Sequence, residues 1–405
     1  MALFYNIFSN FSTPNGNFFQ KGGVFLKVTG IICEYNPFHL GHHKQLCCLK
    51  QENTAVVCLM SGNFVQRGHP AIFDKMLRAE AAVRCGADLV LELPITAALS
   101  SAEGFAAMGV QILSPFCDQL CFGAETADPD QLERIAAALL SDEFKNALRV
   151  ELDIGLSFPA ARQKALAAMG FDAKLLEKPN NILAVEYCKA IISQKASMKP
   201  LPILRGGDYH AQSANLQDPS ATAVRKLICE NAPWKSYIPS DANTCFDQAT
   251  VHDRAFGEAA ILGRLRTMTD AQFEALPFGS EGLWRKLMHA ARKQASLEDI
   301  LTETKSKRYT RTRLDRMVMC AFLGITESDL AQAIPYTRIL AFNDTGREIL
   351  KYAKTFFPLV NAGEVRSEPY QQLEDRCGDL YGLFAKAPEA PGRTKNERVF
   401  YLNEG

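Results

Sequence analysis

The sequence feature with the most chemical content is the string His39-Leu40-Gly41-His42. It follows an apolar run from Val24 to Cys33 that predicts a buried strand, and a helical pattern begins at about Leu40. At such a turn, free backbone N–H groups and the positive end of the helix dipole face a ligand above the sheet. The two imidazoles add donors for phosphate oxygens, and Gly41 leaves room for a nucleotide base. The pattern therefore predicts a site for a nucleotide phosphate.

Two other interpretations of these histidines remain open. Both could simply cap the helix without touching a ligand. Alternatively, His39, His42 and His43 could hold a metal ion. The metal is the weaker alternative, because no cysteine or acidic residue follows at the spacing of a ligand set. The motif by itself does not separate helix capping from phosphate binding.

The elements that must position this motif alternate between strand and helix. Further strands are expected at Ala55 to Met60, Ala87 to Leu93, Gln119 to Phe122 and Leu201 to Arg205. Helices are expected at Asp74 to Cys85, Gly104 to Leu113, Pro129 to Leu152, Pro159 to Met169, Ile182 to Ser193 and Ser220 to Asn231. This alternation is typical of an α/β fold with a parallel sheet, in which ligands bind beyond the carboxyl ends of the strands.

Composition restricts the possible partners and the compartment. The 405 residues contain 45 Lys and Arg and 45 Asp and Glu, so any contact with nucleic acid must come from a local patch. The 12 cysteines lack zinc-site spacing, and neither a signal peptide nor an apolar run of about 18 residues is present. We therefore expect a cytoplasmic chain with reduced thiols and no membrane segment.

Several longer strings, in matching order, resemble the bacterial tRNA(Met) cytidine acetate ligases, members of the nucleotidyltransferase superfamily with an H-x-G-H signature. The strings are Gly30 to His42, Met60 to Gly68, Gly86 to Pro94, Phe122 to Glu125, Lys178 to Asn181, Arg205 followed by Asp208-Tyr209-His210, and Ser220 to Arg225. Two features depart from the family pattern: Ala124 stands where a serine is expected, and an extension precedes Val24.

The resemblance implies an ATP site and names its residues. The ATP-binding residues would be Ile32, Cys33, Glu34, Tyr35, Asn36, Pro37, Phe38, His39, Leu40, Gly41, His42, His43, Lys44, Gln45, Gly123, Asn180 and Arg205. His39, His42, Arg205 and Arg225 would carry the catalysis. Other roles stay open for some of them: Asn180 could cap the helix expected from Ile182, and Arg205 could form a surface ion pair.

The resemblance also implies the reaction. Acetate would attack the α-phosphate of ATP to give acetyl-adenylate, and N4 of the wobble cytidine of elongator tRNA(Met) would then take the acetyl group and release AMP. Mg²⁺ is expected to be held mainly by the phosphates, and neither DNA nor a membrane is an expected partner. Two alternatives remain: a nucleotidyltransferase for a small molecule, and a non-catalytic RNA-binding protein with a relict nucleotide pocket.

A dense basic segment in the second half is the candidate RNA surface. Its residues are Lys305, Lys307, Arg308, Arg311, Arg313 and Arg316, with Tyr309 among them. Basic residues beside an aromatic suit the RNA backbone, although a solvated helix face would have the same composition. We predict a poorly ordered extension at residues 1–23, a Rossmann-like ATP-binding nucleotidyltransferase domain at residues 24–235, and a mostly helical tRNA-binding domain at residues 236–405.

Overall fold

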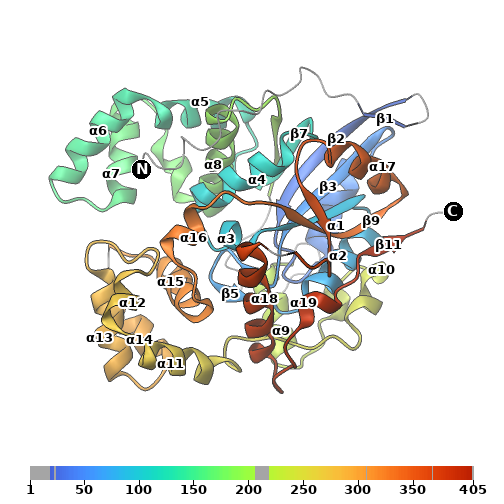
Figure 1. Ribbon diagram of the computed structural model, residues 1–405. Helices are drawn as coiled ribbons and strands as arrows, with labels where there is room; N and C mark the ends of the chain where they lie inside the picture. The colour runs from blue at the N-terminus through green and yellow to red at the C-terminus, as the bar shows by residue number, and fades with distance from the viewer. Residues whose placement is uncertain (1–18, 22–23, 206–218, 307, 367, 404–405) are drawn as a thin grey trace.

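The computed structural model describes residues 19–21, 24–205, 219–306, 308–366 and 368–403, and its central feature is one nine-stranded sheet (Figure 1). Five strands run parallel in the order β6-β3-β2-β7-β8. They are β2 (Val24–Cys33), β3 (Thr54–Ser61), β6 (Leu89–Leu93), β7 (Gln119–Ala124) and β8 (Lys199–Leu204). The strand order reverses direction between β2 and β7, which creates a crevice at the carboxyl ends of these two strands. The predicted α/β fold with a Rossmann-like parallel sheet is confirmed.

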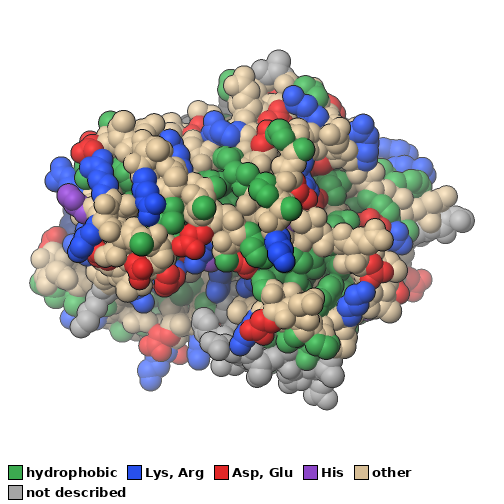
Figure 2. All heavy atoms as spheres, turned by 90° about the horizontal axis from the view of Figure 1, so that it is seen from below, with side chains coloured by type: hydrophobic (Ala, Val, Ile, Leu, Met, Phe, Trp, Pro, Cys, Tyr) green, Lys and Arg blue, Asp and Glu red, His purple; other side chains and the backbone are tan. Residues whose placement is uncertain are grey.

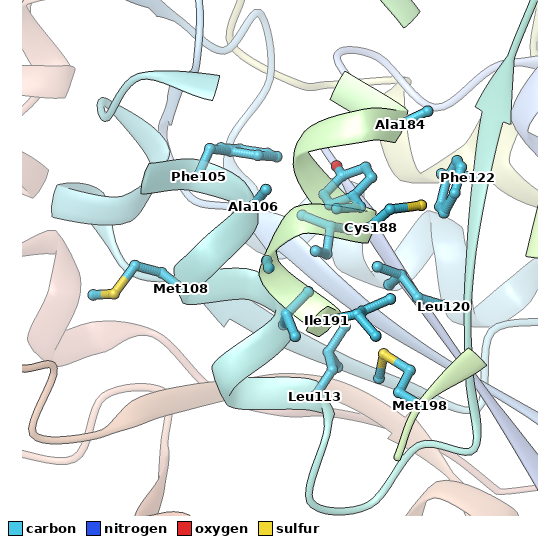
Figure 3. Packing of buried hydrophobic residues seen from close by; sticks show 14 of the residues in the cluster. Phe105, Ala106, Met108, Leu113, Leu120, Phe122, Ala184, Cys188, Ile191 and Met198 are labelled. Carbon is cyan, nitrogen blue, oxygen red and sulfur yellow. The ribbon is translucent and has the colours of Figure 1, made fainter. Parts of the chain in front are cut away.

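Helices cover both faces of the sheet in its first half. Alternate residues of β3 enter two separate cores: Val57 and Leu59 belong to one, Val56 and Cys58 to the other. The first core is completed by α4 and α8, whose side chains lie against β7 in Figure 3. The helices of this half are α1 (Leu40–Leu49), α2 (Lys75–Arg84), α3 (Ile95–Ala98), α4 (Ala102–Leu113), α5 (Pro129–Leu140), α6 (Asp142–Asp153), α7 (Phe158–Ala168), α8 (Pro179–Ser193) and α9 (Ala221–Cys229).

The second half is mostly helical and builds a core of its own around Leu287, Leu301 and Met317. Its helices are α10 (Ser240–Asn243), α11 (Glu258–Thr267), α12 (Asp270–Glu274), α13 (Leu283–Lys293), α14 (Leu297–Thr304), α15 (Arg311–Leu323), α16 (Glu327–Ala331), α17 (Asp344–Ala353), α18 (Pro369–Tyr381) and α19 (Arg393–Asn396). None of the helices that the structure describes combines the length and hydropathy needed to cross a membrane.

Three strands of this second half nevertheless belong to the sheet of the first. They are β9 (Thr337–Asn343), β10 (Leu359–Asn361) and β11 (Phe400–Leu402). β9 pairs antiparallel with β6, and both β10 and β11 pair with the other edge of β9. The sheet is therefore not confined to the region predicted at residues 24–235, whereas the division into domains itself stays a prediction. The two remaining strand pairings are β1 (Phe19–Lys21) on β2 and a small hairpin of β4 (Phe64–Val65) with β5 (His69–Pro70).

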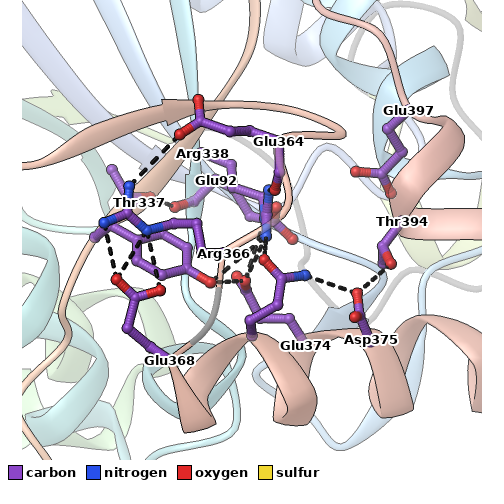
Figure 4. A network of polar contacts seen from close by, with 12 residues as sticks. Glu92, Thr337, Arg338, Glu364, Arg366, Glu368, Glu374, Asp375, Thr394 and Glu397 are labelled. Atoms are coloured by element: carbon purple, nitrogen blue, oxygen red, sulfur yellow. Dashed lines mark hydrogen bonds and ion pairs between the residues drawn. The ribbon is translucent and has the colours of Figure 1, made fainter.

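A buried polar network fixes the second half onto the sheet (Figure 4). Arg338 of β9 is 1% exposed, and its Nη2 lies 2.9 Å from Oε2 of Glu374 on α18. Nearby, Nζ of Lys75 on α2 lies 2.8 Å from Oε2 of Glu92 and 3.2 Å from Oε2 of Glu397. Burial raises the pKa of Glu397 to about 7, and the neighbouring Glu92 adds to the shift, while Lys75 opposes it. Residues far apart in the sequence thus depend on one another for their charge balance.

Candidate active site

A cavity of about 720 Å³ opens at the switch point of the sheet, where β2 and β7 end. One wall of the cavity, on the side of the sheet, is formed by β2 and the loop after it, by Phe122 and Gly123 of β7, and by the first turn of α8. Arg205 follows β8 and Arg225 lies on α9. The opposite wall comes from the β4–β5 hairpin and from residues 252–258 and 297–298 of the helical half. The cavity therefore brings the two halves of the chain together.

His39 and His42 form a reciprocal cap at the start of α1. Nδ1 of His39 accepts a hydrogen bond from the backbone N–H of Gly41 at 3.1 Å, and Nδ1 of His42 accepts one from the backbone N–H of His39 at 3.3 Å. The two rings are stacked with centroids 3.7 Å apart. Helix capping and phosphate binding were alternatives at the sequence level, but this geometry lets one ring do both, because capping uses only Nδ1.

The Nε2 atoms of the pair are the chemically important ones. Burial, and then the charges of Arg205 and Arg225, lower the pKa of His39 to about 3. Burial, followed by His39 and Arg205, lowers the pKa of His42 well below its usual value. A neutral imidazole whose Nδ1 accepts carries its proton on Nε2. Nε2 of His39 is buried and has no hydrogen-bond partner within the described chain, which leaves a donor directly behind His42, the member of the pair that lines the cavity.

The two predicted arginines approach this pair from different elements. Arg225 donates from Nη1 to the backbone carbonyl of Asn36 at 2.6 Å and from Nη2 to Oγ1 of Thr222 at 3.1 Å. Arg205 is exposed at the end of β8, and its Nη1 lies 3.5 Å from Oδ1 of Asn180. Both guanidinium charges act on His39, and that of Arg205 also acts on His42, so the two arginines lie near this pair although they come from separate elements.

Asn180 is held by a residue that sequence reasoning did not assign to the site. α8 begins at Pro179, three residues before the expected start, so Asn180 lies within its first turn rather than capping a helix from Ile182. Oε1 of Glu125 accepts from Nδ2 of Asn180 at 2.8 Å, and its Oε2 accepts from the backbone N–H of Asn181 at 2.8 Å. Proline at the first helical position was the available signal for this start. The role of Glu125 depends on a tertiary contact that no local pattern reveals.

Gly123 leaves space where a ligand could lie. A Cβ built there would meet only the side chain of Arg205, at 3.5 Å, which is ordinary contact. The glycine is therefore not required by the protein's own packing, and the room it leaves belongs to the cavity. A side chain at this position would project into the space beside Arg205.

Only part of the predicted segment from Ile32 to Gln45 faces the cavity. The lining residues among them are Ile32, Cys33, Glu34, Tyr35, Asn36, His42 and Gln45. Phe38 is buried in the core, and Lys44 is exposed. Arg78, which we did not predict, is fully buried below the loop and donates to the carbonyls of Glu34 at 2.6 Å and Ser61 at 3.1 Å. It fixes the ends of β2 and β3 relative to each other.

The six basic residues of the predicted RNA surface do not share one environment. Arg316 is 8% exposed, and its guanidinium lies 5.0 Å from the ring centroid of Phe278. Arg311 forms a bidentate pair with Glu298 at 2.7 and 2.6 Å, and Arg313 donates to the carbonyl of Phe278 at 3.0 and 2.7 Å. Lys305 and Arg308 are exposed, and Lys307 lies outside the described residues. Figure 2 accordingly shows basic side chains interspersed with acidic ones over the end formed by α12 to α14.

Comparison with known proteins gives consistent matches. The family model of the HIGH nucleotidyl transferases matches residues 26–396. The tRNA(Met) cytidine acetate ligase of Clostridium novyi (strain NT) is 37% identical over 350 residues, which cover 81% of this chain and 88% of that protein. The ligase of the same name from Clostridium perfringens is 37% identical over 391 residues, covering 88% of this chain and 95% of the relative.

Solved structures agree with the sequence matches. The apo form of Thermotoga maritima TmcAL is similar with a TM-score of 0.86 and 29% identity, and the match covers 93% of this chain and 100% of that one. A second form of the same protein, bound with alpha-thio ATP, matches with a TM-score of 0.82 and 30% identity over the same shares.

Proposed function

This chain belongs to the HIGH nucleotidyl transferases and, within them, to the tRNA(Met) cytidine acetate ligases, which makes it an ATP-dependent ligase; from that premise we propose that it activates acetate as acetyl-adenylate and acetylates N4 of the wobble cytidine of elongator tRNA(Met). The observation that carries the proposal is His42 on the wall of the switch-point cavity, with His39 stacked against it. One ring of the pair has a buried donor without a partner among the described residues, and two arginines lie close by.

The first step joins acetate to the AMP part of ATP. A carboxylate oxygen of acetate attacks the α-phosphorus of ATP, and the bond from that phosphorus to the bridging oxygen breaks to release pyrophosphate. The Nε2–H groups of His39 and His42 donate to phosphate oxygens as negative charge moves onto the leaving group. Arg205 and Arg225 counter the same charge. Because these histidines are neutral, they stabilise the departing charge as hydrogen-bond donors and do not need to transfer a proton.

The second step makes the amide. N4 of the cytidine attacks the acetyl carbon, the carbon–oxygen bond to the phosphate breaks, AMP leaves, and the nitrogen loses one proton to solvent or to a phosphate oxygen. Binding of the acetyl-adenylate and the cytidine in one cavity would supply most of the rate enhancement, because the alignment of two reactants can make a strong base unnecessary.

The proposal includes Mg²⁺ as an ion bound mainly to the phosphates of ATP. In the described part of the chain, no group of three or more His, Cys, Asp or Glu is placed to hold a metal ion. Among the described residues, the charged and imidazole side chains that line the ATP side are Arg205, Arg225, the neutral His42 and a single carboxylate, Glu34. A magnesium ion would therefore be coordinated chiefly by phosphate oxygens and water, its usual environment in nucleotide sites.

The RNA surface is proposed from exposed charge on the second half. Lys305 and Arg308 are the exposed members of the predicted set that the structure describes, and Arg285 and Lys286 of α13 are exposed as well. Arg308 has an acidic neighbour, Glu281, at 3.3 Å, but that pair lies at the surface, where ion pairs contribute little. These side chains could exchange their present contacts for RNA phosphates at low cost.

Two measurements test the reaction. Acetate-dependent exchange of labelled pyrophosphate into ATP, without RNA, would report the first step. Mass spectrometry of tRNA nucleosides after incubation with ATP, Mg²⁺ and labelled acetate would report the second, and acetylated cytidine carrying the label is expected. Exchange that needs no acetate but requires a phosphorylated small molecule would instead indicate a small-molecule nucleotidyltransferase. Absence of ATP binding would indicate an RNA-binding protein with a relict pocket.

A further inference from the structure

Part of the cavity lining lies outside the residues assigned to ATP. Its walls are the β4–β5 hairpin and the helical half, and its lining residues are Val65, Gln66, Arg67, His69, Pro70, His252, Asp253, Arg254, Ala255, Glu258, Leu297 and Glu298. None of these residues belongs to the segments predicted to bind ATP. We call this region the acceptor arm.

A short chain of hydrogen bonds connects the acceptor arm to the phosphate side. The backbone carbonyl of Asn36 accepts from Arg225, and Oδ1 of the same residue accepts from the backbone N–H of Ile72 at 2.8 Å. The carbonyl of Ile72 then accepts from the backbone N–H of His252 at 2.9 Å. Arg254 follows two residues later. The segment that carries Arg254 is thus connected, through Ile72, to the loop that precedes the catalytic histidines.

The hairpin is pressed against the helical half at Gly68. This glycine has a φ of +75°, and a Cβ there would lie 2.5 Å from the backbone nitrogen of Arg316 on α15. Only glycine allows this approach. The contact fixes the hairpin relative to Arg254, because Arg67 and His69 stand on either side of Gly68 while Arg254 pairs with Asp315 of the same helix α15.

The charges of the arm suit a polyanion. Burial, followed by the charges of Arg254, Arg225 and Arg67, lowers the pKa of His69 to about 3, with Asp253 opposing. Three arginines therefore act on this one imidazole, which stays neutral and offers one donor and one acceptor. The carboxylates of the arm are engaged: Glu258 accepts from the backbone N–H of Leu297 and Asp253 from that of Ala255, each at 2.7 Å, and Glu298 is held by Arg311.

Arg254 is fixed from behind by an ion-pair chain. Its Nη1 lies 2.6 Å from Oδ1 of Asp315, which is 5% exposed, and Nε of Arg311 lies 3.2 Å from the same oxygen. A guanidinium has five N–H donors in a planar fork. With one nitrogen committed to Asp315, the remaining edge can meet a phosphate in the cavity.

We propose that the acceptor arm receives the nucleotide to be acetylated, with Arg67 and Arg254 at its flanking phosphates and His69 at the edge of its base. The proposal rests on the function proposed above, which requires the attacking amine to reach an acetyl group in this same cavity. Reacting atoms must come within about 3 to 3.5 Å, so the base must enter the cavity rather than dock outside it. The side of β2, β7 and α8 is assigned to ATP, and the arm is the part of the described cavity lining that this assignment leaves for the base.

The test separates the two half-reactions in the full chain. In Arg254→Gln and Arg67→Gln, acetate-dependent pyrophosphate exchange without RNA should stay within about twofold of the wild type. Acetyl transfer to a tRNA(Met) transcript, measured in a single turnover, should fall by about 10²-fold, the usual cost of misplacing a reactant. A transfer rate that is unchanged in both variants would overturn the proposal, and so would exchange and transfer that fall together.

Asp315→Asn is the matched control for Arg254→Gln. It weakens the ion pair between residues 254 and 315 but keeps the charge of Arg254 in the cavity, so its transfer rate should fall much less. Equal losses in the two variants would mean that the ion pair serves only the fold, and would overturn the assignment of Arg254. Should Arg254→Gln fail to fold, Arg67→Gln, on the hairpin outside this ion-pair chain, decides alone. A wild-type protein with no acetate-dependent exchange would contradict the proposed function instead, which is a separate outcome.

Discussion

The crevice at the strand ends and the basic segment at residues 305–316 were both identified as functional from residue types, but they differ in how the fold uses them. In the crevice, His39 and His42 are oriented by backbone hydrogen bonds of their own helix turn. In the basic segment, three of the five described residues turn back into the protein and bind carboxylates, carbonyls or an aromatic ring. A motif that is bound to a backbone turn determines where its side chains point. A high density of charged residues does not determine where each side chain points.

This difference separates the roles that the two regions can have. Groups whose positions are fixed before the ligand arrives can stabilise a developing charge without reorganising. Exposed lysines and arginines with weak surface pairs are better suited to holding a long, flexible partner through many small contributions. Large effects on chemistry are therefore expected from the crevice, and small effects on binding from the exposed charges.

The largest effect is expected in His42→Ala, which removes a donor from the crevice. Acetate-dependent pyrophosphate exchange should fall by about 10² to 10³, as for loss of one preorganised donor. His43→Ala is the matched control, since His43 lies on the same helix turn but does not line the cavity. Near-normal exchange in His42→Ala, or an equal loss in both variants, would remove the contrast between the crevice and the rest of the surface.

A second test concerns Glu397, at the contact between the two halves. Its pKa is about 7 in the folded protein, above the ordinary value of 4.5, so the folded state binds more protons between these two values. Stability supplied by this group is present at low pH and is lost as pH rises toward 7, by up to about 3 kcal/mol. Glu397→Gln should reduce the dependence of the unfolding free energy on pH. Urea unfolding at pH 5 and pH 8 measures it, and equal slopes with pH in both proteins would contradict it.

A smaller effect is expected in Glu125→Ala, which leaves the histidines untouched. Asn180 and the first turn of α8 would lose their anchor, at a cost of about 1.5 kcal/mol for hydrogen bonds to a charged group. The KM for ATP should rise about tenfold with a lesser change in kcat. Asp128→Ala is the control, because Asp128 caps α5 in the same way. A fall in kcat at unchanged KM would show that Glu125 acts on the chemistry instead.

The smallest effect is expected from the exposed charges. The double variant with Lys305→Ala and Arg308→Ala should bind tRNA(Met) a few-fold more weakly, and its salt slope should drop by at most about 1.8 if both contact phosphates. ATP binding should be unchanged. Lys145 and Lys164 are exposed basic residues of α6 and α7 and provide a matched double variant. If that variant changes the salt slope as much as the first, the basic residues act through the overall electrostatic field of the protein rather than through a local RNA-binding surface.

The sequence predicted the elements of the crevice well because their signals are local. The strand from Val24 to Cys33 has the expected bounds, and α1 begins at Leu40 as predicted. β9 was missed, because the apolar pattern of Thr337–Asn343 contains Arg338, whose burial depends on Glu374 and Gln371 from a distant helix. Arg316 was misjudged as a surface residue for the corresponding reason: burial and its stacking on Phe278 come from tertiary packing.

The position of β9 also determines when this protein can fold. β6 is an inner strand only because Thr337–Asn343 pairs with it, and β11 is added from residues 400–402. A ribosome releases these residues long after β6, so the nascent chain exposes the apolar edge of β6 until they emerge. Such an edge is a template for pairing with other chains, which makes assistance during translation valuable. A chain cut after residue 335 is expected to aggregate in light-scattering measurements, and a soluble, ATP-binding fragment of that length would contradict this order of events.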